Sequence, residues 1–361
     1  MTWPCKPRTR AKLAILDGYL AAWFAIIAQR FRGAVYFDGF CGPGRYATGE
    51  SGSALLAAKH ATNVCERMPT FRPTLILNDS DPAALQNLNT ELAQITVHRN
   101  VTVSILQQEF AESASATAIA EARRVKVPLF SFIDPFGIKD TPLSVVLSLL
   151  KLPSSEAFIN FMGGWSNRFI NHPDEQVALR VQELLGGDHA REVLAASDRI
   201  VVILEIYKAK LRSSAKFVRS FSLFDEGNVP DNFLIFCGNN SRGFVKMKEA
   251  MWKLDVVNGS RFSERTEMSR LAGQGELFMG GPQLGALPSD ILRKLNDGPH
   301  SVATLRDWVE ADTDYLAQHL RSTLTKFEEQ RVLSIHDPQG DGRRRRVGTW
   351  PDRLILSLRA S

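Results

Sequence analysis

The chain has 361 residues, of which 44% are hydrophobic and 23% charged, a composition typical of a globular protein with room for one large and one small domain. It carries 44 basic and 39 acidic residues, so a formal net charge of +5 indicates only a mild preference for anionic partners. Its four cysteines are widely spaced and include no CxxC pair, so the sequence indicates neither a disulfide framework nor a zinc site. We therefore expect reduced thiols and a cytoplasmic protein.

The first predicted element is an amphipathic helix from Lys12 to Arg30, in an N-terminal segment (residues 1–30) packed on the core. Its apolar residues recur every three or four positions, as on one face of a helix. The apolar run from Leu16 to Ala28 contains Asp17, is too short to span a bilayer and precedes no small-residue cleavage site. We expect no membrane anchor.

Strands and helices then alternate through residues 31–255. The predicted strands are Val35–Phe37, Thr74–Leu77, Val101–Leu106, Leu129–Ile133 and Ala157–Met162. Helices are expected to begin near Ser53, Pro82, Ala111 and Pro142. This alternation predicts an α/β fold with a Rossmann-like, doubly wound parallel sheet, which binds its ligands at the carboxyl ends of the strands.

The second half of this domain departs from simple alternation. Residues 166–215 are expected to form a helical insertion. Phe217–Leu223 and Asn232–Cys237 are predicted to pair antiparallel at the sheet edge, and a helix follows over Arg242–Leu254. Residues 256–288 are rich in glycine and lack periodicity, which predicts a linker.

Residues 289–361 are expected to form a winged helix-turn-helix-like domain. The predicted helices are Ser289–Leu295, Val302–Glu310 and Asp314–Glu329, and the predicted hairpin strands are Val332–Ile335 and Arg345–Gly348. Arg343, Arg344, Arg345 and Arg346 would then lie on the wing, where alternate side chains could contact nucleic-acid phosphates. A solvated run of charges is the alternative, and Asp337 and Asp341 weaken the local field.

A glycine-rich turn follows the first strand and gives the strongest functional signal. It contains neither the GxxxxGK[ST] string of a P-loop nor the GxGxxG string of a dinucleotide site. The remaining pattern, Asp-x-x-x-Gly-x-Gly, resembles the first motif of class I methyltransferases, although a purely structural turn is the alternative. The residues predicted to bind S-adenosylmethionine here are Asp38, Gly39, Phe40, Cys41, Gly42 and Gly44.

Acidic residues also follow the second and third strands. An acid at the end of the second strand can accept hydrogen bonds from ribose hydroxyls, for which Asp79 is best placed and Asp81 next. Glu109 and Phe110 follow the third strand, where this family positions the adenine. Each acid could instead cap the helix that follows it.

Asp134, Pro135, Phe136 and Gly137 follow the fourth strand and resemble the motif of methyltransferases that act on exocyclic amines, in particular the tRNA guanine-N2 dimethyltransferases. A carboxylate and a backbone carbonyl can accept the two amine hydrogens while an aromatic ring stacks on the base. We therefore predict that Asp134, Pro135 and Phe136 form the catalytic site. The alternative is a turn with a packed phenylalanine.

The string from Tyr36 to Tyr46, with Gly52-Ser53, the segment from Phe132 to Gly137 and Asn160-Phe161, resembles the three-Cys-motif partner protein family (TcmP). The resemblance covers the chain from its first helix to Leu254. It implies a methyltransferase-like Rossmann fold, a radical-adenosylmethionine-like partner bearing three cysteines, and a role in nucleic-acid repair or modification. The single proline of Asp-Pro-Phe-Gly leaves the target atom undefined.

These patterns support one leading hypothesis and two alternatives. The leading hypothesis is an S-adenosylmethionine-dependent methyltransferase that acts on an exocyclic amine of DNA or RNA, without a metal. The first alternative is a non-catalytic adaptor that binds nucleic acid or a partner protein. The second is a metal-dependent nuclease that uses Asp38, Asp79, Asp81 and Asp134.

Overall fold

The computed structural model describes residues 3–137, 141–225, 230–264, 267, 282–340 and 345–359. The chain forms two compact units. The first comprises Met1–Ala250 and Ser260–Leu277, and the second comprises Met251–Gly259 and Phe278–Ser361.

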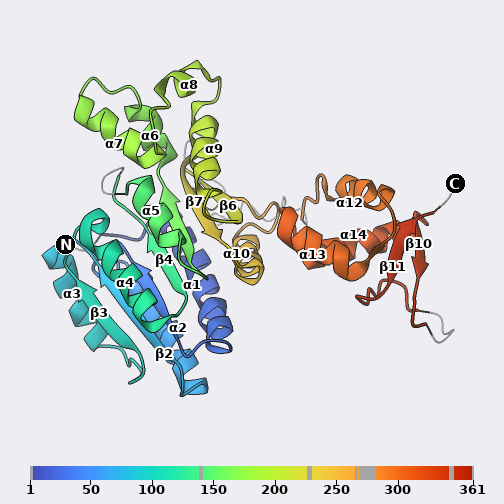
Figure 1. The fold of residues 1–361 in the computed structure, drawn as a ribbon, viewed down its shortest axis with the longest axis horizontal. Coiled ribbons are helices and arrows are strands. Elements are labelled where there is room, and N and C mark those ends of the chain that lie inside the picture. The colour runs from blue at the N-terminus through green and yellow to red at the C-terminus, as the bar shows by residue number, and fades with distance from the viewer. Residues whose placement is uncertain are drawn as a thin grey trace. The chain divides into compact units, whose positions relative to one another are not determined.

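An eight-stranded sheet forms the centre of the first unit (Figure 1). Its strands are β1 (Gly33–Asp38), β2 (Arg72–Asn78), β3 (Thr102–Leu106), β4 (Leu129–Ile133), β5 (Glu156–Phe161), β6 (Phe217–Phe224), β7 (Pro230–Gly238) and β8 (Arg261–Ser263). They lie in the order β3-β2-β1-β4-β5-β7-β6-β8, and β1 to β5 are parallel. The first five strands thus have the 3-2-1-4-5 order of a Rossmann-like sheet, which confirms the predicted α/β class.

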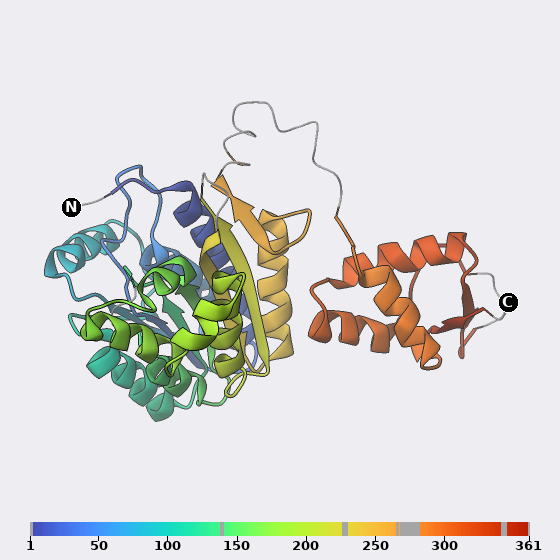
Figure 2. The ribbon, with the colours of Figure 1, turned by 90° about the horizontal axis from the view of Figure 1, so that it is seen from above.

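Helices cover both faces of this sheet (Figure 2). The chain forms α1 (Pro7–Ala28), α2 (Ser53–Arg67), α3 (Pro82–Ala93), the π-helical turn η1 (Phe110–Ala114), α4 (Ser115–Val125), α5 (Leu143–Leu150) and α10 (Ser241–Leu254). Alternate residues of β1 serve opposite faces: Val35 shares a core with α4 and α5, whereas Tyr36 stacks near Phe130, which contacts Tyr19 of α1. Cover on both faces explains why all six residues of β1 are buried.

Helix α1 is long and largely apolar. With 22 residues it is long and apolar enough to cross a membrane by length and composition alone, because it begins well before the run from Leu16 to Ala28 that was expected to be too short. Its apolar residues pack inward, however: Tyr19 and Trp23 are buried against Phe130 of β4. Burial in the core therefore accounts for the hydrophobicity of α1.

The connection between β5 and β6 is helical, and these helices group beyond one end of the sheet (Figure 1). They are α6 (Gly163–Phe169), α7 (Glu175–Leu185), α8 (Ala190–Ala195) and α9 (Arg199–Leu211).

Strands β6 and β7 pair antiparallel as predicted, but they do not form the sheet edge. Strand β7 lies between β5 and β6, and β8 pairs in parallel outside β6, within the range expected to be a linker. Burial explains the inner position of β7, because the residues from Phe233 to Cys237 are all buried, whereas β6 alternates between buried and half-buried residues.

Residues 282–340 and 345–359 of the second unit form three helices and a small antiparallel sheet. In chain order these are α12 (Leu287–Asn296), β9 (His300–Ser301), α13 (Val302–Asp312), α14 (Ala317–Glu329), β10 (Leu333–His336) and β11 (Ile355–Leu358), and the strands lie in the order β10-β11-β9. Leu305, Leu324 and Leu356 are fully buried in one core, which joins α13, α14 and β11.

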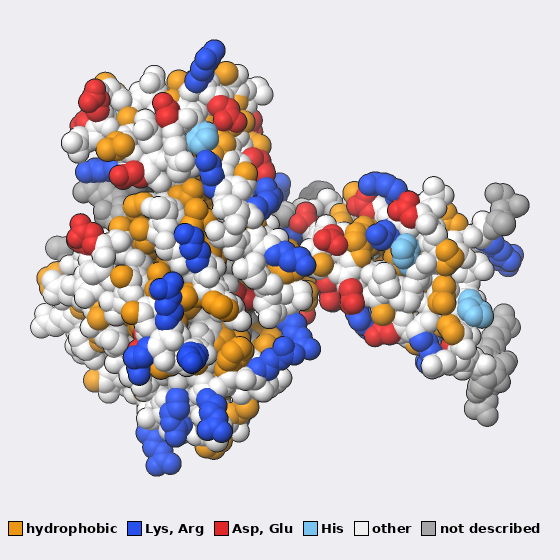
Figure 3. Space-filling model, in the orientation of Figure 1, with side chains coloured by type: hydrophobic (Ala, Val, Ile, Leu, Met, Phe, Trp, Pro, Cys, Tyr) orange, Lys and Arg blue, Asp and Glu red, His pale blue; other side chains and the backbone are white. Residues whose placement is uncertain are grey.

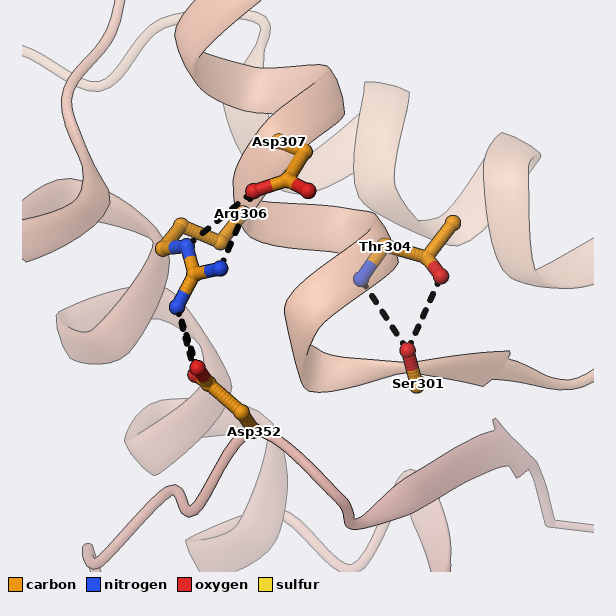
Figure 4. A network of polar contacts seen from close by, with 5 residues as sticks. All are labelled: Ser301, Thr304, Arg306, Asp307 and Asp352. Atoms are coloured by element: carbon orange, nitrogen blue, oxygen red, sulfur yellow. Dashed lines mark hydrogen bonds and ion pairs between the residues drawn. The ribbon is translucent and has the colours of Figure 1, made fainter.

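The predicted second hairpin strand at Arg345–Gly348 is wrong, because the strand that pairs with β10 is β11. A buried residue at Leu356 allows β11 to complete the core, which a run of arginines cannot do. The segment before β11 is held on α13, where Arg306 donates to both carboxylate oxygens of Asp352 at 2.6 Å (Figure 4). Ser301 caps the same helix by accepting the Thr304 N–H at 3.0 Å.

Candidate functional site

The glycine-rich loop between β1 and α2 is shaped by backbone conformations that favour glycine. Gly42 and Gly44 have φ of +60° and +84°, in the left-handed region. A Cβ on Gly42 would meet no atom within 4 Å, so the backbone there is open to close approach. The Gly52 N–H donates to the Gly44 carbonyl at 2.7 Å, which closes the loop just before α2.

Phe110 supports this loop from below. A Cβ on Gly39 would lie only 2.6 Å from the Phe110 ring, so the ring occupies the space that a side chain there would need. Phe110 is 1% exposed and stacks against Phe37 and Phe40 at 5.9 and 5.1 Å between ring centroids. The aromatic side chain of this predicted cofactor residue is therefore a packing element.

Asn78, which the sequence reasoning did not single out, ties three strand ends together. Its Nδ2 donates to the carbonyls of Gly39 and Gln108 at 3.1 and 3.0 Å, and its Oδ1 accepts the Gln108 N–H at 3.1 Å. Its own carbonyl accepts the Cys41 N–H at 2.8 Å. The sequence did contain a signal for this role, because Asn78 is a polar residue at the end of an apolar strand and directly precedes Asp79.

A cavity of about 370 Å³ lies at the carboxyl ends of β1, β4 and β5. It brings the glycine loop together with the motif after β4, and α1 forms a further wall. The predicted residues that line it are Phe40, Cys41, Gly42, Gly44, Asp134, Pro135 and Phe136. The lining residues that were not predicted include Trp3, Lys6, Lys12, Tyr46, Asn160 and Asn232.

Asp134 is held by two partners in this cavity. Lys12 of α1 forms an ion pair with Oδ2, and the side-chain amide of Asn160 donates to Oδ1 at 2.8 Å. The Lys12 side chain is 9% exposed and the Asp134 side chain 18%, so the pair is largely shielded from water. The carboxylate is thus fixed in orientation and balanced in charge.

The helical pattern could have predicted that Lys12 has an acidic partner. It begins the apolar stripe that continues through Ile15, Tyr19 and Trp23, all of which are buried. A lysine on the buried face of a helix needs a partner, because burial of an unpaired charge is costly. The pattern therefore signals an acid across the core, without identifying which one.

Asp38 lies deeper than Asp134. It is fully buried, accepts from the Tyr36 hydroxyl at 3.1 Å and from the Phe40 N–H at 3.3 Å, and is not among the cavity-lining residues. Burial raises the pKa of Asp38 to about 7, although hydrogen bonds from Ser53, Tyr36 and Phe40 oppose the rise. Asp38 supports the first residues of the loop from inside the core.

Cys41 and Tyr46 add little ionisable character to the cavity. Burial raises the pKa of the Cys41 thiol and that of the Tyr46 hydroxyl far above their ordinary values, so both groups are neutral at physiological pH. Cys41 therefore behaves as a small packed residue of the loop.

The acids after β2 and β3 line a different part of the strand ends. Asp79 accepts the Gly42 N–H at 2.9 Å and the Asp81 N–H at 3.0 Å, so it contacts the loop directly. Asp81 is exposed and caps α3 by accepting the Ala83 N–H at 2.9 Å. Glu109 is exposed at the start of η1. None of these three is among the cavity-lining residues.

The arginines of the presumed wing divide between described and undescribed residues. Arg343 and Arg344 lie outside the described residues. Arg345 pairs with Glu328 of α14 and lies 4.7 Å from the Trp350 ring centroid, whereas Arg346 is exposed. Arg345 is therefore committed to packing within the second unit.

The second unit is not more basic than the first unit on the face drawn in Figure 3. Lys and Arg side chains gather at the end of the first unit where β2 and α2 are drawn, whereas the second unit shows acidic and basic side chains together (Figure 3). A mixed field of this kind gives weak attraction to a phosphate backbone.

The four acids of the nuclease hypothesis do not form a metal site. Asp38 is buried, Asp81 caps a helix, and Asp134 is paired with Lys12. Within the described ranges, no three His, Cys, Asp or Glu residues are grouped so that they could hold a metal ion. The geometry gives this hypothesis no support.

No protein-family model and no curated protein sequence matches the chain. Among solved structures, the protein LPL1258 from Legionella pneumophila is similar with 11% identity over 63% of this chain and 84% of its own, at a TM-score of 0.38. The cofactor-bound protein Rv0187 from MTB has 10% identity over 65% of this chain and 91% of its own, at a TM-score of 0.32. Geranyl diphosphate C-methyltransferase from Streptomyces coelicolor has 10% identity over 61% of this chain and 78% of its own, at a TM-score of 0.25. Similarity at this level does not establish a shared activity.

Proposed function

We propose that this protein is an S-adenosylmethionine-dependent methyltransferase that modifies an exocyclic amine in nucleic acid. The observation that carries the proposal is the cavity in which the open glycine loop meets Asp134, Pro135 and Phe136. A Rossmann-like sheet binds ligands at this end of its strands.

The loop residues fit the methionine and ribose parts of such a cofactor. Gly42 leaves its backbone open to close approach, and Cys41 and Gly44 line the same wall. One carboxylate oxygen of Asp79 accepts the Gly42 N–H and the other accepts the Asp81 N–H. Each oxygen has a further lone pair that can accept a hydrogen bond from a ribose hydroxyl. When bound, the cofactor supplies an electrophilic methyl group on a sulfonium.

Asp134 is the residue that orients the target amine. Lys12 and Asn160 fix its carboxylate, so the remaining lone pairs can accept an amine hydrogen without a change of rotamer. The carbonyl of Pro135 accepts a second hydrogen, and the exposed ring of Phe136 stacks on the base. Held by Asp134 and the Pro135 carbonyl, the amine would present its nitrogen to the cofactor's methyl group and would lose one proton to solvent.

Methyl transfer from labelled S-adenosylmethionine to DNA and RNA tests this function. We expect transfer to one of them, and Asp134→Asn should lower the rate about 100- to 1,000-fold, because it removes a preorganised charge at the reacting centre. Calorimetry should show that the variant still binds S-adenosylmethionine. Cofactor binding without transfer to any nucleic acid would contradict the proposal.

A second function is favoured by one observation, the ion pair that already occupies Asp134. In this version the chain is a non-catalytic adaptor, with a partner such as a radical-adenosylmethionine-like protein bearing three cysteines. The second unit has the chain order helix, strand, helix, helix, strand, strand, and we propose that it serves as a winged-helix contact module. Loss of cellular function on deletion of residues 289–361, with full function in Asp134→Ala, would favour the adaptor.

A further inference from the structure

Two large aromatic side chains meet at the cavity although both remain exposed to water. Phe136 is 77% exposed and Trp3 is 39% exposed. Their ring centroids lie 5.3 Å apart with an interplanar angle of 89°, an edge-to-face contact. Both residues line the cavity that contains Asp134.

This exposure has a cost that the fold does not require. Burial of a phenylalanine side chain stabilises a folded protein, and Phe136, which is largely exposed, gains little of this stabilisation. Other aromatic residues at the strand ends, such as Phe40 and Phe110, pack against each other instead. Two exposed aromatic rings that line a cavity favour a ligand that would cover their apolar surfaces.

The backbone around Trp3 is fixed to the glycine loop. The Trp3 carbonyl accepts the Ala47 N–H at 3.0 Å, and the Cys5 N–H donates to Thr48 Oγ1 at 3.0 Å. Pro4 lies between these two anchors and limits the backbone further. The Trp3 backbone is therefore preorganised, while its partly exposed ring can rotate away from Phe136.

The surroundings of the ring pair select among flat ligands. Exposed Lys6 lines the same cavity, so an anionic group beside the ring would be attracted. Asp134 lies two residues before Phe136 along the chain and offers acceptors at the edge of a stacked ring. A nucleotide in a strand combines a planar ring, hydrogen-bond donors at its edge and a phosphate.

We infer that Trp3 and Phe136 form a clamp that holds the target base of a nucleic-acid strand between their rings. The edge-to-face contact opens on binding, and each ring then faces one side of the base. Trp3 is thus a substrate-binding residue contributed by the segment before α1. This inference rests on the proposed nucleic-acid substrate but does not require that a methyl group be transferred.

Binding of fluorescently labelled single-stranded DNA and RNA, measured by anisotropy without cofactor, tests the clamp. Trp3→Ala should weaken binding by about 5- to 150-fold, the range found when one stacking residue is removed. Trp3→Phe retains a ring and should bind close to the parent protein. Strands that carry abasic sites should bind the parent weakly and should lose the difference between the parent and Trp3→Ala.

Leu179→Ala is the matched control, since Leu179 is 51% exposed on α7 and does not line the cavity. Unchanged strand binding by Trp3→Ala would overturn the clamp. A variant that lost only S-adenosylmethionine binding would also overturn it, because the cofactor's adenine would then lie between the rings. Free mononucleotides serve as a second probe, and binding of these but not of strands would also overturn it. Strand binding that depends on Trp3 without methyl transfer would support the clamp and contradict only the proposed reaction.

Discussion

Asp38 is the last residue of β1 and Asp134 directly follows the neighbouring parallel strand β4, yet the two carboxyl groups differ in their surroundings. Asp38 is fully buried among neutral donors, and burial raises its pKa to about 7. Asp134 lies at the cavity with Lys12 as its ion-pair partner.

The difference teaches that position at a strand end does not define the role of an acid. The partner supplied by another element defines it, because a cation balances the charge of a carboxylate while neutral donors only offset part of the cost of burial. Lys12 comes from α1, which is more than 100 residues away from Asp134 along the chain. The following predictions test this comparison.

The largest expected effect is that of Lys12→Met, which leaves the Asp134 carboxylate shielded from water without its cation. We expect the free energy of unfolding to fall by about 3–5 kcal/mol, as is typical when one partner of a buried ion pair is removed. Urea denaturation followed by circular dichroism measures the loss. The double variant Lys12→Met/Asp134→Asn should recover much of it, and equal losses in the single and double variants would show that the pair is not coupled.

Asp38 should make stability depend on pH in the opposite sense to an ordinary paired carboxylate. Its pKa is about 7 in the folded protein and near 4 when unfolded, so the folded state binds more protons between these values. The contribution to the free energy of unfolding is therefore complete at low pH and is lost as pH rises to about 7. Asp38→Asn should gain up to about 4 kcal/mol relative to the parent between pH 5 and pH 8.

Glu156 provides a control for this pH dependence. It is buried at the first position of β5, where it accepts the Tyr19 hydroxyl at 2.6 Å, and burial raises its pKa to about 7 as well. Like Asp38→Asn, Glu156→Gln should be more stable to heat than the parent between pH 5 and pH 8. It should leave S-adenosylmethionine binding unchanged, because Glu156 does not line the cavity. A parent protein whose stability rises from pH 5 to pH 8 would contradict both assignments of pKa.

The smallest expected effect separates the two acids after β2. Asp81→Ala should cost about 1 kcal/mol of stability through loss of the α3 cap, with little change in cofactor affinity. Asp79→Ala should weaken cofactor binding, since Asp79 holds the Gly42 N–H and faces the loop. Paired calorimetric titrations would decide between them, and weaker cofactor binding by Asp81→Ala alone would reverse these roles.

Local patterns predicted much of the fold and of the candidate site. The apolar run from Leu129 to Ile133 marked a buried parallel strand, and the observed β4 has these bounds. The glycine loop was predicted to bind the cofactor and the segment from Asp134 to Phe136 to form the catalytic site, and residues of both line one cavity. Such features depend on residues close together in sequence, whose periodicity and turn chemistry are local properties.

Pairing between distant elements could not be predicted in the same way. The position of β7 inside the sheet depends on which strand offers two apolar faces after folding. The strand predicted at Arg345–Gly348 was wrong, because Leu356 of β11 fills the core of the second unit and a run of arginines cannot. Glu109 and Asp81 were predicted beside the cofactor on sequence order alone. The folded chain leaves both exposed and outside the cavity wall.

The sequence by itself determined the α/β class, the glycine loop and the strand-end acids, since these follow from local hydrophobic periods and from the conformations that glycine permits. Only the tertiary structure decided that Asp134 meets Lys12, that Asp38 is sealed in the core, and that Trp3 meets Phe136 at the cavity. The physical reason is that the charge state and the exposure of a side chain depend on its neighbours in space, which are brought together by the packing of α1 on the sheet.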